Sequence, residues 1–222
     1  MGRKKQLQLP DLDGSDDRSN KISSASKKIE DSQSTKSIDV KHILSLDVST
    51  SCTGVCILDK NLNLVVLDAV KFPASCITMF DKADRGIEEI KKLVNGRNID
   101  KIFVEANAKM FMPGFSSADT LITLAKFNVL LSYLSHKAFG AQVIDVNVSS
   151  ARKAIGFKSN KADKRPKKEQ VKDYVIALHP EFPYKKHIAK AGRQKNQEVY
   201  DSSNGDMIDA WVIAKGGSLL NP

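Results

Sequence analysis

The order of apolar runs along the chain restricts its possible folds more than any other feature. Residues 43–48, 54–58 and 62–70 are short apolar runs separated by turn-forming residues, which predicts three antiparallel strands. A meander followed by helix-connected strands predicts an α/β fold whose five-stranded mixed sheet has helices on both faces. The later elements predicted from apolar periodicity are a helix at 80–94, a strand at 100–105, a helix at 117–139, a strand at 142–148 and two helices around 171–178 and 205–214.

The composition excludes several classes of protein. Hydrophobic residues make up 41% of the 222 residues, enough for one substantial core, so a wholly disordered chain is excluded. The apolar runs are far shorter than the roughly 18 residues of a membrane span. Three cysteines do not make a disulfide scaffold, and the polar beginning of the chain does not resemble a signal peptide. We therefore expect a soluble cytoplasmic protein with no membrane partner, most naturally in a bacterial or viral setting.

The chain divides into two regions by composition. Residues 1–40 are rich in Ser, Asp, Lys and Asn and lack apolar periodicity, which predicts a disordered or partner-dependent arm. Residues 41–222 contain all the predicted elements and form the predicted folded domain. Within this domain, residues 152–195 carry fourteen Lys and Arg against four Asp and Glu, a local net charge of +10. A basic stretch of this kind is typical of a surface that binds a nucleic-acid backbone.

Two acids occupy positions where the apolar pattern would take a hydrophobic residue. Asp47 lies at the end of the first predicted strand, and Glu105 closes the fourth. A buried carboxylate is costly without a cation or hydrogen-bond donors. If these strands are parallel neighbours, both acids lie at the carboxyl edge of the sheet, where open α/β folds usually place their sites.

Two further acids lie three residues apart on the last predicted helix. Asp206 and Asp209 therefore project from one face of that helix. Each acid alone is weak evidence, because an Asp near a helix start is more often a cap. Four carboxylates that meet would form an oxygen-only ligand set, which suits Mg²⁺ or Mn²⁺ and fits zinc poorly.

The motifs that carry these acids resemble those of the RuvC-type Holliday junction resolvases, in the ribonuclease H-like superfamily. The resemblance runs from about Lys41 to Gly217 in the same order, although a longer lysine-rich loop at 158–167 departs from it. The segments that carry it are Ser45–Thr50 with Thr53-Gly54-Val55, then Ile102–Glu105, Val148–Phe157 with Lys167–Val171, and Gly205–Ala210.

The resemblance implies a ribonuclease H-like fold and a homodimer that hydrolyses phosphodiester bonds at four-way or other branched DNA junctions. Two Mg²⁺ ions, which Mn²⁺ can replace, would be held by the four acids and would clamp the scissile phosphate. It also implies two groups of DNA-binding residues. The basic group is Arg152, Lys153, Lys158, Lys167 and Lys168, and the aromatic group is Phe111 and Phe115, which would either open base pairs at the crossover or anchor their loop.

Other functions remain open at this point. The first acidic motif also occurs in actin-like kinases and ATPases, but those need a second phosphate loop and a doubled domain. A catalytically idle nucleic-acid-binding or assembly subunit could have the same fold. Within the nucleases, flaps or RNA–DNA hybrids are alternative substrates. Cys52 and Cys56 lack the further partners of a zinc site and are interpreted as small buried hydrophobes.

Overall fold

A five-stranded mixed sheet forms the centre of the described fold. The computed structural model describes residues 41–106 and 117–222. The strands run in the order β3-β2-β1-β4-β5, with β1 antiparallel to β2 and parallel to β4, which confirms the predicted sheet. The strands are β1 (Lys41–Asp47), β2 (Cys52–Asp59), β3 (Leu64–Lys71), β4 (Asn98–Glu105) and β5 (Gln142–Val146).

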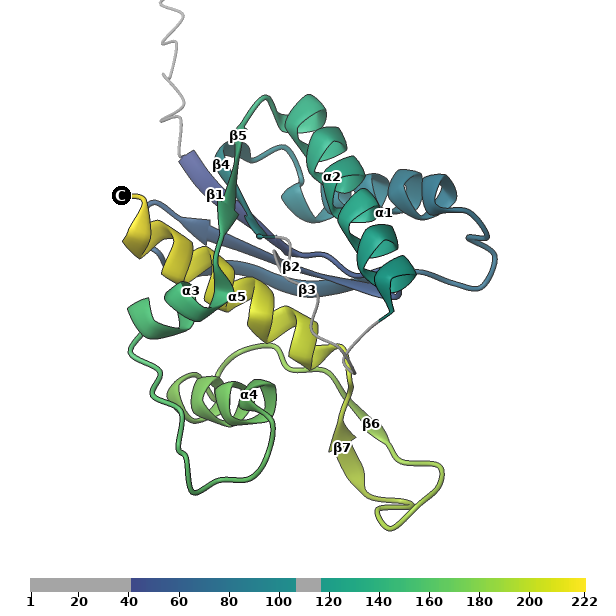
Figure 1. Ribbon diagram of the computed structural model, residues 1–222, viewed down its shortest axis with the longest axis vertical. Helices are drawn as coiled ribbons and strands as arrows, with labels where there is room; N and C mark the ends of the chain where they lie inside the picture. Colours follow the sequence, from purple (N-terminus) through teal and green to yellow (C-terminus); the bar gives the residue numbers. More distant parts are fainter. Residues whose placement is uncertain (1–40, 107–116) are drawn as a thin grey trace, which may run out of the picture. The chain divides into compact units, whose positions relative to one another are not determined.

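Helices cover both faces of this sheet, as predicted (Figure 1). Helices α1 and α2 lie on one face, and α3, α4 and α5 lie on the other. No described helix combines the length and the apolar character needed to cross a membrane. The bounds are α1 (Met79–Val94), α2 (Ala118–Phe139), α3 (Val148–Ala154), α4 (Lys167–Leu178) and α5 (Asn204–Leu220).

Two apolar layers hold these helices on the sheet. Side chains of β1 and β4 such as Leu44 and Ile102 pack with Ile90 of α1 and Phe127 of α2 on one face. On the other face Phe103 packs against α5, which is buried around nearly its whole circumference. A helix that is apolar on all sides is typical of one enclosed in a core. The layer arrangement therefore fixes α5, with its two acids, directly against the sheet.

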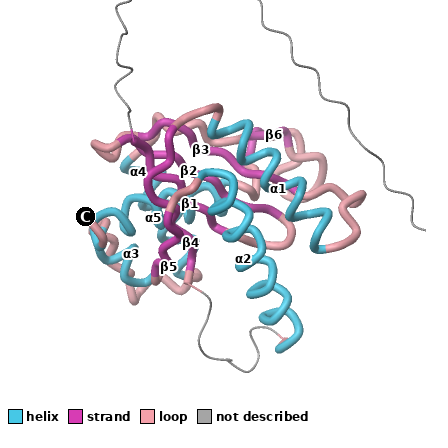
Figure 2. The backbone as a smooth tube through the Cα atoms, turned by 90° about the horizontal axis from the view of Figure 1, so that it is seen from above, coloured by secondary structure: helices cyan, strands magenta, loops and turns pink. Residues whose placement is uncertain are grey.

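Local signals in the sequence set the ends of the two outer helices. Thr78 and Asp81 form a reciprocal capping box at the start of α1. Ser117 caps α2, and Gly140 ends it in the left-handed conformation that glycine adopts without strain. In Figure 2 the N-terminal part of α2 extends away from the sheet, and its side chains there are mostly exposed.

The structure contains two elements for which the sequence analysis gave no range, the short helix α3 and a hairpin before α5. The fifth strand ends at Val146 and not at Val148, because Asn147 caps the short helix α3 by accepting a hydrogen bond from the Ser150 amide. A hairpin of β6 (Lys186–Ile188) and β7 (Glu198–Tyr200) precedes α5 and was not predicted. The predicted N-terminal arm, residues 1–40, and the two aromatic residues Phe111 and Phe115 lie outside the described residues.

Candidate functional site

Strand pairing brings Asp47 and Glu105 together at the carboxyl ends of β1 and β4. The register places Leu46 opposite Val104, so the next residue on each strand is one of these acids. Asp47 is only 8% exposed, and its carboxyl group is close enough to that of Glu105 for each to affect the other's pKa. The parallel alignment that the sequence suggested is therefore what makes these two acids neighbours.

Close packing of α5 on the sheet adds Asp206 and Asp209 to the same place. Gly54, which pairs with Asp47 across β1 and β2, lies against the backbone of Asp206. A Cβ atom at position 54 would be 1.9 Å from the Asp206 carbonyl oxygen. One turn further along, Ser45 Oγ donates a hydrogen bond of 2.6 Å to the Ala210 carbonyl. These contacts hold the first turns of α5 next to the acidic end of β1.

Two basic side chains contact the acids directly. Lys168 Nζ, from the first turn of α4, lies 2.9 Å from Asp209 Oδ2 and 3.5 Å from Asp206 Oδ1. Arg152 Nη2, from α3, donates to Asp209 Oδ1 at 3.1 Å. The side chains of Arg152 and Asp209 are 17% and 7% exposed, so this pair is shielded from solvent. The sequence did not indicate that Arg152 faces an acid, because its position depends on how α3 packs against α5.

The electrostatics of the cluster are those of crowded, buried carboxylates. Burial raises the pKa of Asp47 well above its ordinary value, and the nearby carboxylate of Asp209 raises it further. Burial and Asp209 also raise the pKa of Glu105. Burial alone would lower the pKa of the Lys168 ammonium, but the surrounding carboxylates outweigh it and raise that pKa. The four acids outnumber the two cations that contact them, so the site keeps a formal negative charge that favours a further bound cation.

The chemistry of the cluster fits a hard divalent cation. Carboxylate oxygens are the ligands preferred by Mg²⁺ and Mn²⁺, and a cation would relieve the repulsion that raises the pKa of Asp47. In the conformation of residues 41–106 and 117–222, however, no three Asp, Glu, His or Cys side chains surround a common point. The Lys168 ammonium lies between Asp206 and Asp209 instead. Coordination by both helix acids therefore requires Lys168 to move away from them.

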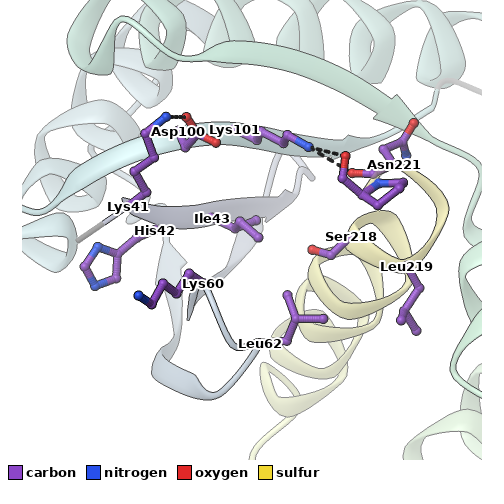
Figure 3. Close-up of a pocket in the computed structure, with 11 residues that line it drawn as sticks. Lys41, His42, Ile43, Lys60, Leu62, Asp100, Lys101, Ser218, Leu219 and Asn221 are labelled. Carbon is purple, nitrogen blue, oxygen red and sulfur yellow. Dashed lines mark hydrogen bonds and ion pairs between the residues drawn. The ribbon is translucent and has the colours of Figure 1, made fainter. Parts of the chain in front are cut away.

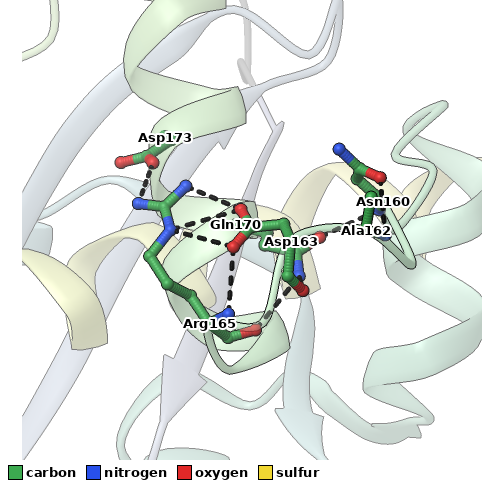
Figure 4. A network of polar contacts seen from close by, with 6 residues as sticks. All are labelled: Asn160, Ala162, Asp163, Arg165, Gln170 and Asp173. Atoms are coloured by element: carbon green, nitrogen blue, oxygen red, sulfur yellow. Dashed lines mark hydrogen bonds and ion pairs between the residues drawn. The ribbon is translucent and has the colours of Figure 1, made fainter.

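The lysine-rich loop before α4 is folded onto that helix by a polar network (Figure 4). The guanidinium of Arg165 bridges Asp163 and Asp173, at 2.8 and 2.7 Å. Gln170, buried on α4, accepts from the Asn160 amide at 2.9 Å and donates to the Arg165 carbonyl at 3.1 Å. Because this network fixes the start of α4, it also fixes the direction in which Lys168 approaches the acids.

The remaining basic candidates lie at different distances from the cluster. Lys153 and Lys167 line a hollow of about 150 Å³ together with Arg152, Ser149 and Ser159. Lys158 is exposed on the preceding loop and lies outside that lining. Of the four lysines in the predicted basic group, the structure therefore brings Lys168 to the acids, and Lys153 and Lys167 to a hollow that Arg152 also lines.

Two other features of the structure lie outside this chemistry. Burial, together with the neighbouring carboxylate of Asp206, raises the pKa of the Cys52 thiol to about 12, so it remains protonated.

A hollow of about 450 Å³ lies between the start of β1 and the end of α5 (Figure 3). Its lining includes the Lys41–Asp100 ion pair and Lys101, which donates to backbone carbonyls at the chain end. It is at the opposite end of β1 from Asp47.

Comparison with known proteins supports the fold. No family model matches the sequence, and no curated protein matches it either. Among solved structures, Thermus thermophilus RuvC in complex with a Holliday junction substrate superposes with a TM-score of 0.53 at 11% identity, over 81% of this chain and 93% of that one. The yeast mitochondrial Holliday junction resolvase matches at 14% identity over 80% of this chain and 77% of that one. Its TM-score of 0.47 is too low to support an argument. The chain therefore has the ribonuclease H-like fold found in the Holliday junction resolvase RuvC.

Proposed function

We propose that the chain is a metal-dependent endonuclease that hydrolyses phosphodiester bonds in branched DNA, with four-way junctions as its first substrate. The observation that carries this proposal is the proximity of four acids, from β1, β4 and α5, in a ribonuclease H-like fold. Arg152 of α3 and Lys168 of α4 contact Asp209 directly. The fold shared with a junction-bound RuvC supports the choice of substrate.

In this proposal the residues of the site have three different roles in cleavage. Asp47, Glu105, Asp206 and Asp209 would hold the divalent cations, which supply charge neutralisation at the scissile phosphate and activation of water. Arg152 donates a hydrogen bond to Asp209 and so orients that carboxylate. Lys168 lies at Asp209, so after it moves away from the acids its ammonium would be available to a phosphate oxygen bound there, where a positive charge stabilises the transition state.

The basic side chains beside the acids would position the DNA. Lys153 and Lys167 flank one hollow, whose two serine hydroxyls add donors for phosphate oxygens. Such contacts fix the register of a duplex without reading its sequence. Lys158 extends this basic surface along the loop. Selectivity for branched DNA would then come from the shape of the substrate and not from base contacts.

The test uses four labelled substrates: a four-way junction, a flap, a plain duplex and an RNA–DNA hybrid. Each is incubated with the protein in Mg²⁺ and in EDTA, beside the variant Asp206→Asn. We expect paired, symmetric nicks in the junction alone, and we expect them to disappear in EDTA and in the variant. Cutting of flaps or hybrids would keep the chemistry and overturn the substrate. Tight junction binding without cleavage in Mg²⁺ or Mn²⁺ would overturn the enzyme and leave the idle DNA-binding subunit.

We further propose that the protein acts as a homodimer, because two symmetric cuts need two sites. Helix α2 offers a surface for such a contact. Ile122, Val129 and Tyr133 are 51%, 62% and 57% exposed, and their spacing of seven and four residues places them on one helix face. An exposed apolar stripe on a helix is typical of a protein contact.

The dimer is tested by charging this stripe. The double variant Val129→Glu, Tyr133→Glu should sediment as a monomer of about the 24.4 kDa chain mass, whereas the unchanged protein should sediment at twice that mass. Ile77→Glu is the matched control, because Ile77 is an 85% exposed apolar residue away from α2. A double variant that remains dimeric would exclude α2 as the interface, and a monomeric unchanged protein would exclude a dimer formed without DNA.

A further inference from the structure

The hairpin of β6 and β7 projects from the molecule next to the acidic cluster. Figure 1 shows it extending from the start of α5, away from the sheet. Its strands pair in antiparallel register, with His187 opposite Val199. Residues 189–197 form its tip, and most side chains of the hairpin are exposed. An element of this kind adds no core, so its presence calls for another explanation.

The base of the hairpin is attached firmly to the helix that carries two of the four acids. Asn204, the first residue of α5, accepts from the Lys185 amide at 2.8 Å and donates to the Lys185 carbonyl at 2.6 Å. Asp201 binds Lys71 of β3 at 2.8 Å and accepts from the Ser203 hydroxyl at 2.6 Å. The hairpin therefore ends only a few residues before Asp206 and is fixed relative to it.

The tip of the hairpin is ordered and positively charged. Its backbone is closed by hydrogen bonds from Asn196 N to Ala189 O and from Ala189 N to Gln197 O, at 2.8 and 2.9 Å. It carries three cations, Lys190, Arg193 and Lys195, and no acid. Within residues 41–106 and 117–222 none of the three forms an ion pair, although the hairpin strands do contain one, Lys186 with Glu198 at 2.9 Å. A solvated surface is usually mixed in sign, so a tip of unpaired cations indicates an anionic partner.

The chemistry of the tip selects among anionic partners. Residues 189–197 contain no aromatic side chain, so single-stranded bases have nothing to stack on. The exposed Tyr200 lower on the hairpin is already engaged, since its ring packs against Tyr184 and lies 5.6 Å from Lys186 Nζ. Three cations on an ordered turn can each neutralise a phosphate of a duplex.

The groove beside the hairpin continues this basic surface toward the acids. A hollow of about 370 Å³ lies between α4 and the hairpin, and Lys172 of α4 and Lys186 of β6 both line it. Lys172 follows Lys168 by one turn on the same helix. Lys168 and Lys172 on α4 thus lead from the acidic cluster to the hollow at the hairpin, where Lys186 is paired with Glu198.

We propose that the β6–β7 hairpin is a second DNA-binding arm, whose tip residues Lys190, Arg193 and Lys195 contact the phosphates of a duplex held at the acidic site. This proposal rests on the proposed nuclease function, because it assigns the arm to the same DNA. It adds a separate contact that neither cleavage chemistry nor the basic residues beside the acids require.

The experiment measures binding separately from cleavage. The triple variant Lys190→Gln, Arg193→Gln, Lys195→Gln is titrated in EDTA, at several salt concentrations, with a labelled four-way junction, a plain duplex, single-stranded DNA and single-stranded RNA. We expect the Kd to rise about tenfold or more, and the slope of log affinity against log salt to fall by about 0.9 for each phosphate that the variant no longer neutralises. Cleavage at saturating DNA in Mg²⁺ should stay within about twofold. The control is Lys91→Gln, Lys92→Gln, Lys137→Gln, which removes equal charge from α1 and α2 on the other face of the sheet.

Each outcome supports or overturns the arm. Weaker binding and a smaller salt slope in the hairpin variant alone support it. Equal weakening in both variants would mean a general charge effect, and unchanged binding by the hairpin variant would mean that the tip does not touch DNA; either overturns the arm. A larger effect on single-stranded DNA or RNA than on duplex would overturn the assigned partner. If the unchanged protein binds none of these nucleic acids, the proposed function itself fails, which is distinguishable from failure of the arm.

Discussion

Asp47→Asn is expected to lower metal-dependent cleavage of a four-way junction by about 1,000-fold or more, while making the metal-free protein more stable at neutral pH. The loss follows because Asp47 is central among the four acids, and cation stabilisation of the transition state contributes several kcal/mol, at about 1.4 kcal/mol for each tenfold in rate. The gain in stability follows because Asp47 is 8% exposed and repelled by the neighbouring carboxylates.

The stability effect has a defined pH dependence. The pKa of Asp47 in the folded protein is raised above the ordinary value of 3.8, so the unfolded chain releases this proton at a lower pH than the folded protein does. Below pH 3.8 the Asp47 carboxyl is protonated in both the folded and the unfolded protein, so it does not lower the free energy of unfolding. As pH rises from there through the folded pKa, ionisation progressively destabilises the fold, and at higher pH the full penalty remains. In thermal melts in EDTA, the melting temperature of Asp47→Asn should therefore exceed that of the unchanged protein by more at about pH 7 than at about pH 3.5.

Asp100→Asn is the matched control for this substitution. Asp100 is an exposed acid on β4 that pairs with Lys41 at 2.8 Å, at the end of the sheet away from the acidic cluster. The Asp100→Asn variant should cleave the four-way junction at the rate of the unchanged protein. If Asp47→Asn cleaved normally, the catalytic assignment would be wrong. If Asp47→Asn had a lower melting temperature than the unchanged protein at neutral pH, the carboxylate of Asp47 would stabilise the fold, and our electrostatic interpretation would be incorrect.

Gly54→Ala should destabilise the protein by about 3 kcal/mol, toward the upper end of what overpacking costs. The new Cβ would lie 1.9 Å from the Asp206 carbonyl oxygen and 3.1 Å from the Met207 nitrogen, so backbone and not a flexible side chain must give way. For a chain of this size the melting temperature should fall by roughly 6–12 °C. Cleavage by the remaining folded protein should also drop sharply, because the displaced backbone carries Asp206.

Gly205→Ala provides the comparison for Gly54→Ala. Gly205 precedes Asp206 on α5, and a Cβ there would meet only the Lys168 side chain at an ordinary distance of 3.4 Å. Because alanine is a better helix former than glycine, this variant should be as stable as the unchanged protein or slightly more stable. Normal stability of Gly54→Ala would show that β2 and α5 do not pack as closely as described.

The elements that form the sheet and its main helices were predictable because apolar periodicity encodes them. The buried strand β2 contains the apolar run 54–58, and Gly140 marks the end of α2 as an expected C-cap. The hairpin escaped prediction because its strands have three residues each and present lysine, histidine and glutamate to solvent. Nothing in their pattern distinguishes them from a loop.

The site was predictable in its acids and less so in its cations. Asp47 and Glu105 stood out because each interrupts an apolar run, and parallel pairing of β1 with β4 then follows from the order of elements. The contact between Arg152 and Asp209 depends on how closely α3 meets α5, where a Cβ on Gly216 would be 2.6 Å from the Ala151 backbone. That approach is a property of packing, and the several lysines around the loop gave no sign of which would reach the acids.

The two hydrogen bonds between Asn204 and Lys185 have a consequence for where DNA would be cut. Swinging the hairpin away from α5 would break both bonds, at a cost of about 2 kcal/mol. The distance between the hairpin tip and Asp206 is therefore set by the fold. A duplex bound at the tip would present the same phosphate to the acids each time it binds. The number of base pairs between the bound phosphates and the nick would then be constant, whatever the base sequence. Lengthening the hairpin by one pair of residues should shift that offset and leave the chemistry unchanged.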